Sequence, residues 1–213
     1  MNYWLFAAIL VVVAVLIYLW VGQGLLVSDA FYTQAQAEGY ARQELSYRYP
    51  SADIQIFEAS NRSAAPGKSN WLIKAKVAYG LTTTCPALTL VEMDQKFNFV
   101  PREQAITENC EVLGCKGVPD CVIAFPEEAI IMPFDGDRNP SVQPALSAFV
   151  ARAGGMDNLT ASAVQRAQYT SASNKTYSDV WVVTYTTQNA AKPFEAILNG
   201  TGGAVLEAYE KGV

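Results

Sequence analysis

Residues 180–187 read Val-Trp-Val-Val-Thr-Tyr-Thr-Thr. A run of β-branched and aromatic residues like this predicts a β-strand. Further along, residues 194–198 and 204–209 flank Asn199-Gly200-Thr201-Gly202-Gly203, a polar, glycine-rich segment that predicts a hairpin. These three strands indicate an antiparallel sheet near the C-terminus.

A helix and a modest strand precede this run. Residues 141–153 carry apolar side chains at helical spacing, and Gly154-Gly155 follows as a stop signal. The residues of the predicted apolar face are Val142, Ala145, Leu146, Phe149, Val150 and Ala153. Residues 163–169 form the modest strand. We therefore expect residues 140–213 to fold as one helix packed on a small sheet.

The same order occurs earlier in the chain. Residues 28–48 predict a helix that Pro50 ends, and strand-like runs follow at 54–57, 71–79 and 88–100. These residues form a predicted first unit, 29–100. Helix and three strands thus occur twice, which predicts an internal duplication, although α+β chains also reach this order by chance.

The tryptophans support the internal duplication, and two lysines indicate which face of the strand over 71–79 is exposed to solvent. Trp71 and Trp181 occupy matching places in the two units and are expected to pack helix on sheet, or else to stack on a ligand. Lys74 and Lys76 alternate with the apolar positions of their strand. Both lysines are therefore expected to face solvent.

Residues 101–139 differ from both units. They contain four prolines and three of the four cysteines. Such proline density argues against a helix and confines strands to sheet edges. We expect a stapled connector here, with short strands at most over 121–125 and 129–132.

The four cysteines permit three disulfide pairings. They are Cys85, Cys110, Cys115 and Cys121. The simplest pairing joins Cys85 to Cys110 and Cys115 to Cys121. A zinc site of four thiolates is the rival, although structural zinc usually takes Cys-x2-Cys pairs, and free thiols are a third alternative. Disulfides indicate an oxidising compartment.

Residues 1–28 contain no charged side chain. The apolar core, residues 3–21, is long enough to cross a bilayer, and Tyr or Trp stands at each end of it. The prediction is a transmembrane anchor that contacts membrane lipid through residues 3–21. A buried core helix and a cleaved signal peptide are the alternatives.

Four Asn-x-Ser/Thr sequons follow this segment, at Asn61, Asn158, Asn174 and Asn199. Together with the cysteines they predict that the chain after the anchor lies outside the cytoplasm and carries N-linked glycans. The expected localisation is a cell membrane crossed once, with the C-terminal region extracytoplasmic.

Composition narrows the function classes. The 213-residue chain has no histidine and a formal charge of −5. Catalytic triads with histidine and histidine-ligated metals are therefore excluded. The acidic balance argues against nucleic-acid binding. We expect no enzyme activity, no cofactor and no metal.

Three groups of acidic residues are candidate sites. Residues 135–139, Asp-Gly-Asp-Arg-Asn, place oxygen ligands at alternate positions, as a calcium loop does, but the later bidentate glutamate is missing, which favours a simple turn. Glu127-Glu128 and the pair Glu207 and Glu210 could serve acid–base chemistry. Solvated surface carboxylates are the simpler interpretation.

The second unit resembles PepSY-type domains, which have a cystatin-like layout. The resemblance rests on the helix over 142–153, the strand over 180–185 and the hairpin over 194–206, with its closing Gly-x-Val-Leu pattern at 203–206. It covers about 70 residues. It implies a helix on a curled sheet and a binding or inhibitory module without catalytic residues. The first unit shares the order of elements but lacks the glycine-rich hairpin.

Residues 13–21, Val-Ala-Val-Leu-Ile-Tyr-Leu-Trp-Val, resemble the hydrophobic helix of archaeal type IV pilins. That resemblance implies a filament subunit with a β-rich head. The chain departs from the pilin pattern because no basic leader precedes the hydrophobic run.

The sequence thus predicts an α+β fold: a transmembrane helix (1–28), a first unit (29–100), a connector (101–139) and a second unit (140–213). The predicted function is a non-catalytic, membrane-anchored module that binds a protein partner or joins a homo-oligomeric surface assembly. The resemblance to PepSY domains implies that an exposed sheet face or edge is the recognition surface. The alternatives are a pilin-like filament subunit and a carboxylate-based hydrolase.

Overall fold

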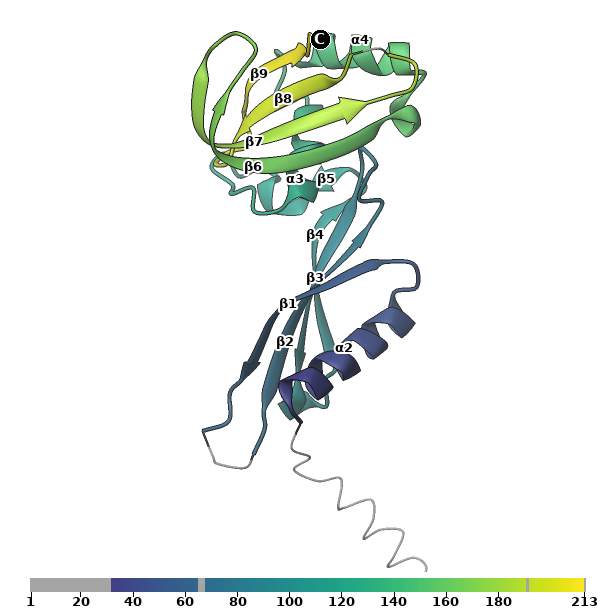
Figure 1. Cartoon of the computed structure of the whole chain (residues 1–213), viewed down its shortest axis with the longest axis vertical. Coiled ribbons are helices and arrows are strands. Elements are labelled where there is room, and N and C mark those ends of the chain that lie inside the picture. Colours follow the sequence, from purple (N-terminus) through teal and green to yellow (C-terminus); the bar gives the residue numbers. More distant parts are fainter. Residues whose placement is uncertain (1–31, 65–67, 191, 213) are drawn as a thin grey trace, which may run out of the picture.

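The computed structural model describes residues 32–64, 68–190 and 192–212. Their architecture is mainly antiparallel β-structure in two sheets, and only three short α-helices accompany these sheets in the described part (Figure 1). The expected α+β class is therefore corrected. The helices are too short and too few to form a layer comparable with the sheets.

The first sheet has the strand order β1-β2-β3-β4-β5. Each neighbouring pair is antiparallel, so the chain runs up and down without a crossover. Its elements are α2 (Gln34–Arg48), β1 (Asp53–Asn61), β2 (Trp71–Tyr79), β3 (Ala87–Asp94), the short 3-10 helix η1 (Gln95–Phe97), β4 (Pro101–Glu108), β5 (Glu111–Val112) and the 3-10 helix η2 (Leu113–Cys115).

The second sheet has the strand order β6-β7-β8-β9, again antiparallel throughout. Its elements are α3 (Pro126–Ile131), η3 (Met132–Phe134), α4 (Gln143–Ala153), η4 (Met156–Asn158), β6 (Thr160–Thr170), β7 (Thr176–Thr186), β8 (Phe194–Asn199) and β9 (Val205–Glu210). The predicted strand at 71–79 and the predicted hairpin around 199–203 are confirmed.

Helix α2 begins where a capping box forms. The Thr33 hydroxyl accepts the backbone N–H of Gln36, and the Gln36 side chain accepts the backbone N–H of Thr33. One face of the helix places small and apolar residues against the first sheet. Ala37, Ala41 and Leu45 are fully buried there, so this face and the sheet form the first core.

The second core is larger and lies between the second sheet and helices α3 and α4. Phe149 of α4 packs against Phe194 of β8, with ring centroids 5.5 Å apart. Tyr185 is completely buried and donates its hydroxyl to the Ile130 carbonyl of α3 at 2.6 Å. A buried tyrosine needs such a partner, so this bond fixes α3 against β7.

The repeated order of helix and strands is present, with one correction. In the first unit α2 lies against β1 and β2, whereas in the second unit the helix against β6 and β7 is α3. The sequence had predicted residues 129–132 as a strand inside a connector. Pro126 occupies the first turn of α3, where its missing N–H costs nothing, so the proline begins the helix instead of preventing it.

The separate connector over 101–139 is likewise corrected. Residues 101–108 form β4 of the first sheet, and α3 belongs to the second core. The two predicted strands around 121–132 are absent from this described segment, apart from an isolated bridge between Val122 and Thr201.

The predicted membrane anchor, residues 1–28, lies outside the described residues. Within the described part of the chain, no helix combines the length and the apolar character needed to cross a bilayer. The described helices thus give the single-pass and signal-anchor predictions no support: the longest, α2, has 15 residues and one apolar face.

The two units meet where α3 packs against the upper ends of β4 and β5 (Figure 1). Lys76 Nζ lies 2.7 Å from Glu127 Oε1 at this junction, and the lysine also lies over the Phe125 ring. Sequence reasoning expected both charged side chains to face solvent. The structure instead buries Glu127 and leaves Lys76 only partly exposed, because α3 covers this part of the first sheet.

Candidate functional site

The disulfide pattern is the clearest match between sequence and structure. Cys85 is bonded to Cys110, and Cys115 to Cys121. This is the simplest pairing of the three. The second disulfide closes a short loop, residues 115–121, which we call the stapled loop.

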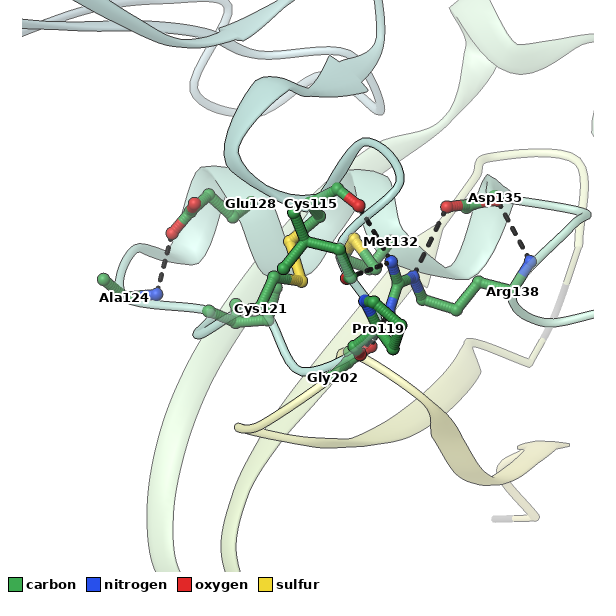
Figure 2. The surroundings of a disulfide bond; sticks show 12 residues. Cys115, Pro119, Cys121, Ala124, Glu128, Met132, Asp135, Arg138 and Gly202 are labelled. Carbon is green, nitrogen blue, oxygen red and sulfur yellow. Dashed lines mark hydrogen bonds and ion pairs between the residues drawn. A yellow bond between two sulfur atoms is a disulfide. The ribbon is translucent and has the colours of Figure 1, made fainter.

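Arg138 ties the stapled loop to the turn between β8 and β9 (Figure 2). One terminal nitrogen of its guanidinium donates to the Pro119 carbonyl at 2.9 Å and to the Gly202 carbonyl at 2.6 Å. The other donates to the carbonyls of Cys115 and Val118 at 2.9 and 3.0 Å. Its four terminal N–H groups are therefore fully used by backbone oxygens.

The remaining Arg138 nitrogen, Nε, faces the Asp135 carboxylate at 3.6 Å. Asp135 also accepts the backbone N–H of Arg138, which closes the turn at the start of the 135–139 segment. This arrangement is the simple turn that the sequence favoured. No group of three or more potential metal-ligating side chains occurs among the described residues.

Backbone pairing reinforces the link between the stapled loop and the β8–β9 turn. Gly202 N donates to the Cys121 carbonyl at 2.6 Å, and Ile123 N donates to the Gly200 carbonyl at 2.9 Å. Gly203 has a φ of +62°, and a Cβ there would lie 2.4 Å from Cε of Met132. The positive φ therefore favours glycine at this point of the turn.

Buried Asn139 also holds the β8–β9 turn in place. Its amide nitrogen donates to the carbonyls of Met132 and Gly203, and its amide oxygen accepts the N–H of Val205. Sequence reasoning treated Asn139 as a candidate calcium ligand. The structure places its side chain inside the protein, where it fixes the first residue of β9 beside η3.

A hollow of about 860 Å³ lies beside the stapled loop. Its floor is apolar: Ile131 and Met132 are buried, and Phe134 is half-buried. Val118 of the loop lines the hollow with 46% of its surface exposed. The volume is in the range of sites that bind a side chain or a small molecule.

The rim of the hollow is acidic. Its two cations are already engaged, since Lys116 pairs with Glu111 at 3.0 Å and Arg138 faces Asp135. Asp120 and Asp137 also line the hollow, and no described cation pairs with either of them. The wall therefore presents two uncompensated carboxylates above an apolar floor, which suits a cationic ligand and disfavours an anion.

The candidate acid–base residues are used structurally instead. Burial raises the pKa of Glu128, although its carboxylate accepts the backbone N–H groups of Ala124 and Phe125 at 2.7 and 2.9 Å and so caps α3 (Figure 2). Glu207 accepts the Tyr177 hydroxyl, and Glu210 pairs with Arg152. None of the four candidate glutamates, Glu127 included, lines the hollow.

The two matched tryptophans also have structural partners. The Trp71 indole N–H donates to the Tyr32 carbonyl at 2.6 Å, and the Trp181 indole N–H donates to the Ile123 carbonyl at 3.0 Å. Trp181 is buried in the second core, as predicted, whereas Trp71 is only half-buried. Neither ring lines the hollow.

All four sequon asparagines are exposed. The Asn158 amide nitrogen donates to the Gly154 carbonyl, while Asn61 and Asn199 use their amide oxygens for local turns. Asn174 lies in the turn between β6 and β7 with a φ of +60°. Glycosylation of these sites stays a prediction.

Sequence reasoning found the cysteines that build the stapled loop but missed the hollow. In the sequence Arg138 is only part of a predicted turn, and the carbonyl groups that its terminal nitrogens bind lie 19 to 64 residues away. No known family, characterised protein or solved structure shows detectable similarity to this chain, so the resemblances to PepSY domains and to pilins stay predictions.

Proposed function

We propose that this protein is a non-catalytic recognition module, working in an oxidising compartment outside the cytoplasm, that binds a basic side chain of a protein partner. The hollow beside the stapled loop is the proposed site. The observation that carries the proposal is the pairing of an apolar floor with two uncompensated carboxylates, Asp120 and Asp137.

The chemistry of the hollow fits lysine or arginine. Both residues carry an aliphatic stem that gains from contact with apolar surface, and a cationic head that needs a carboxylate. Phe134 and Val118 would contact the stem, and Asp120 and Asp137 would attract the head. An interaction of this kind contributes on-rate and specificity as well as affinity.

The rigidity of the site supports recognition. The stapled loop is held by a disulfide, by the four hydrogen bonds of Arg138 and by pairing with the β8–β9 turn. A loop fixed before binding loses little conformational entropy when a partner docks. The disulfides also favour an oxidising compartment, since thiols stay reduced in the cytosol of most organisms.

No catalytic role is proposed. The sequence has no histidine, and Glu128, the carboxylate whose pKa is raised, is occupied as a helix cap. The filament alternative depends on residues that the structure does not describe, so nothing in the described fold favours it.

The proposal is tested by titrating the full chain with N-acetyl-arginine-N-methylamide and following backbone NMR shifts. N-acetyl-citrulline-N-methylamide, which has nearly the same shape without the charge, is the ligand control. The arginine compound is expected to shift resonances of the stapled loop, and the citrulline compound to shift them far less.

The matching protein variant is Asp120→Asn with Asp137→Asn. It should abolish the response to the arginine compound, whereas Asp53→Asn with Asp157→Asn, which removes the same charge at exposed positions outside the hollow, should leave it unchanged. Equal responses to both ligands, or from both double variants, would disprove the proposal.

A further inference from the structure

The two sheets of this protein have four edge strands, and three of them are blunted. A strand edge presents unpaired N–H and C=O groups, so proteins usually obstruct it with bulges, charges or short strands. β1 has a bulge between Ile56 and Glu58, and Arg42 covers the Ile54 carbonyl. β5 has only two residues and pairs with Thr107 and Glu108 alone, and the rest of the β4 edge begins with Pro101 and carries Arg102 and Glu103. β9 is flanked by Asn139 and by charged side chains.

The fourth edge, β6, is the least obstructed. It is 11 residues long and contains no proline, and its only charged side chain is Arg166. Its pairing with β7 keeps one register from Thr160 to Thr170. Residues 164–168 are exposed, so this part of the edge is open to solvent.

The open side of β6 already accepts one hydrogen bond from another part of the chain. The N–H of Ala161 points away from β7 and donates to the Thr82 carbonyl at 2.8 Å. Thr82 belongs to the loop between β2 and β3, which reaches the start of β6 from the first unit (Figure 1). In the described structure, the first unit thus makes a single backbone hydrogen bond to this edge.

The same side continues unpaired beyond that contact. Alternate residues of an antiparallel strand direct their backbone groups to the same side. Ala163, Gln165 and Ala167 therefore present N–H and C=O groups outward, as Ala161 does. No described residue outside the sheet pairs with these outward groups.

We propose that β6 is a docking edge at which an extended segment of another protein adds as a fifth strand to the second sheet. Backbone hydrogen bonds to Ala163, Gln165 and Ala167 would supply the affinity, as they do wherever a peptide augments a sheet. The site lies apart from the hollow and does not depend on the function proposed for it.

The side chains along β6 define the partner's chemistry. Val164, 47% exposed, and Arg166 lie on the same face of the strand, two residues apart. The added segment is therefore expected to place an apolar side chain beside Val164 and a carboxylate beside Arg166. Opposite charges at such cross-strand positions are favourable.

A second copy of this chain fits the edge less well. A symmetric pairing of two β6 strands centred on Gln165 sets each Arg166 opposite Val164 of the other copy. It also places the two Arg166 side chains as diagonal neighbours, at about 7 to 8 Å. Like charges at that spacing repel, so this central register is unfavourable for a second copy, and the single cation Arg166 points to an acidic segment from a different protein.

The test uses a display library of random peptides, selected on the full chain. The discriminating variant is Gln165→Pro, since proline removes an outward N–H that the β6–β7 ladder does not use. Gln165→Ala is the matched control, because it keeps every backbone donor.

Selected peptides are expected to be enriched in Asp or Glu and to bind Gln165→Ala as they bind the native chain. Affinity for Gln165→Pro should fall by about ten-fold or more, equivalent to about 1.4 kcal/mol. Circular dichroism of the proline variant checks that its fold is retained. Selection on Arg166→Glu should instead favour basic peptides.

Hydrogen exchange distinguishes strand addition from binding elsewhere. A bound peptide should slow exchange of the amide protons of Ala163, Gln165 and Ala167, which are unpaired in the free protein. The variant Asp120→Asn with Asp137→Asn should bind the same peptides normally. Peptides that bind Gln165→Pro as well as the native chain, or a selection that yields no peptide sensitive to this change, would overturn the proposal.

Discussion

Lys76 Nζ lies 2.7 Å from Glu127 Oε1, and this ion pair connects the first sheet to the first helix of the second core. Only 12% of the lysine side chain and 2% of the glutamate side chain are exposed. The second carboxylate oxygen of Glu127 has no hydrogen-bond partner in the described structure. This ion pair therefore links the two structural units. Lys76 is the cation that compensates the charge of the buried Glu127 carboxylate.

Replacing Lys76 with methionine should strongly destabilise the protein, because it leaves a buried carboxylate without its cation. The expected loss in free energy of unfolding is about 3 kcal/mol, measured by urea denaturation. The control is Lys74→Met on the same strand, which breaks the more exposed pair with Glu58 and should cost less than about 1 kcal/mol. Equal losses for the two variants would contradict this account of the junction.

The double variant Lys76→Met with Glu127→Gln gives a second check on the same pair. It removes both charges, so it should recover part of the stability that Lys76→Met loses. A double variant less stable than Lys76→Met would show that Glu127 is stabilised mainly by groups other than Lys76, against this account of the pair.

Arg138, whose side chain is largely buried, is expected to contribute strongly to stability. Arg138→Met removes four hydrogen bonds to backbone carbonyls and should lower the free energy of unfolding by about 2 to 4 kcal/mol. Arg152→Met, which breaks the exposed pair with Glu210, should cost less than about 1 kcal/mol. Thermal denaturation of both variants at one pH compares them, and a loss for Arg138→Met no greater than that for Arg152→Met would refute the anchoring role.

The two disulfides should differ in their contribution to stability. Cys85–Cys110 spans 25 residues and Cys115–Cys121 spans 6. Because a longer closed loop removes more entropy from the unfolded chain, Cys85→Ser with Cys110→Ser should cost about 3 to 4 kcal/mol and Cys115→Ser with Cys121→Ser about 2 kcal/mol. Urea denaturation of the two double variants measures the difference, and the reverse order would contradict this entropic account.

Acid should weaken the second sheet through Glu195. Burial alone would raise the pKa of this glutamate, but donation by Tyr169, Tyr209 and Lys211 outweighs burial and leaves the pKa below its usual value of 4.5. A carboxyl group with a lowered folded-state pKa stabilises the fold fully above its unfolded pKa, and this contribution disappears as the pH falls through the folded pKa.

The stability of the native protein should therefore decline as the pH falls below about 4.5. In Glu195→Gln that decline should be shallower, because the group that gains the proton is gone. Urea midpoints measured across the acidic range test this expectation. Identical slopes for the native protein and the variant would exclude Glu195 as a source of the acid sensitivity.

Local patterns predicted much of the strand framework. The alternation over 71–79 matches β2. The predicted strand over 180–187 ends one residue after β7 ends, and β7 begins four residues before it, at Thr176. The glycine-rich segment at 199–203 joins β8 to β9 as expected. These elements were predictable because side-chain period and turn chemistry act between neighbouring residues.

The prediction failed where tertiary contacts decide. Pro126 begins α3, and Glu128, three residues after Phe125, caps its N-terminus, so a proline-rich segment contains a helix. Lys76 and Glu127 lie in regions that look solvated, yet they meet at the junction of the two units. Neither outcome can be read from sequence spacing, because each depends on which surface another element covers.

The same limit applies to the candidate site. The cysteines of the stapled loop were identifiable, but the hollow forms from segments near residues 118, 132, 138 and 202 that only the fold brings together. Asp120 and Asp137 carry no sequence signal, since isolated aspartates in turns are common. What distinguishes them is the apolar floor beneath them and the lack of a described cation beside them.

The most direct test of the recognition proposal is a set of intermolecular nuclear Overhauser effects between bound N-acetyl-arginine-N-methylamide and the full chain. The account predicts contacts from the arginine side-chain methylene protons to the methyl groups of Val118 and the ring protons of Phe134 in the hollow. Contacts only to surfaces outside the hollow would contradict it, and so would the absence of any contact under conditions in which the ligand shifts the protein spectrum.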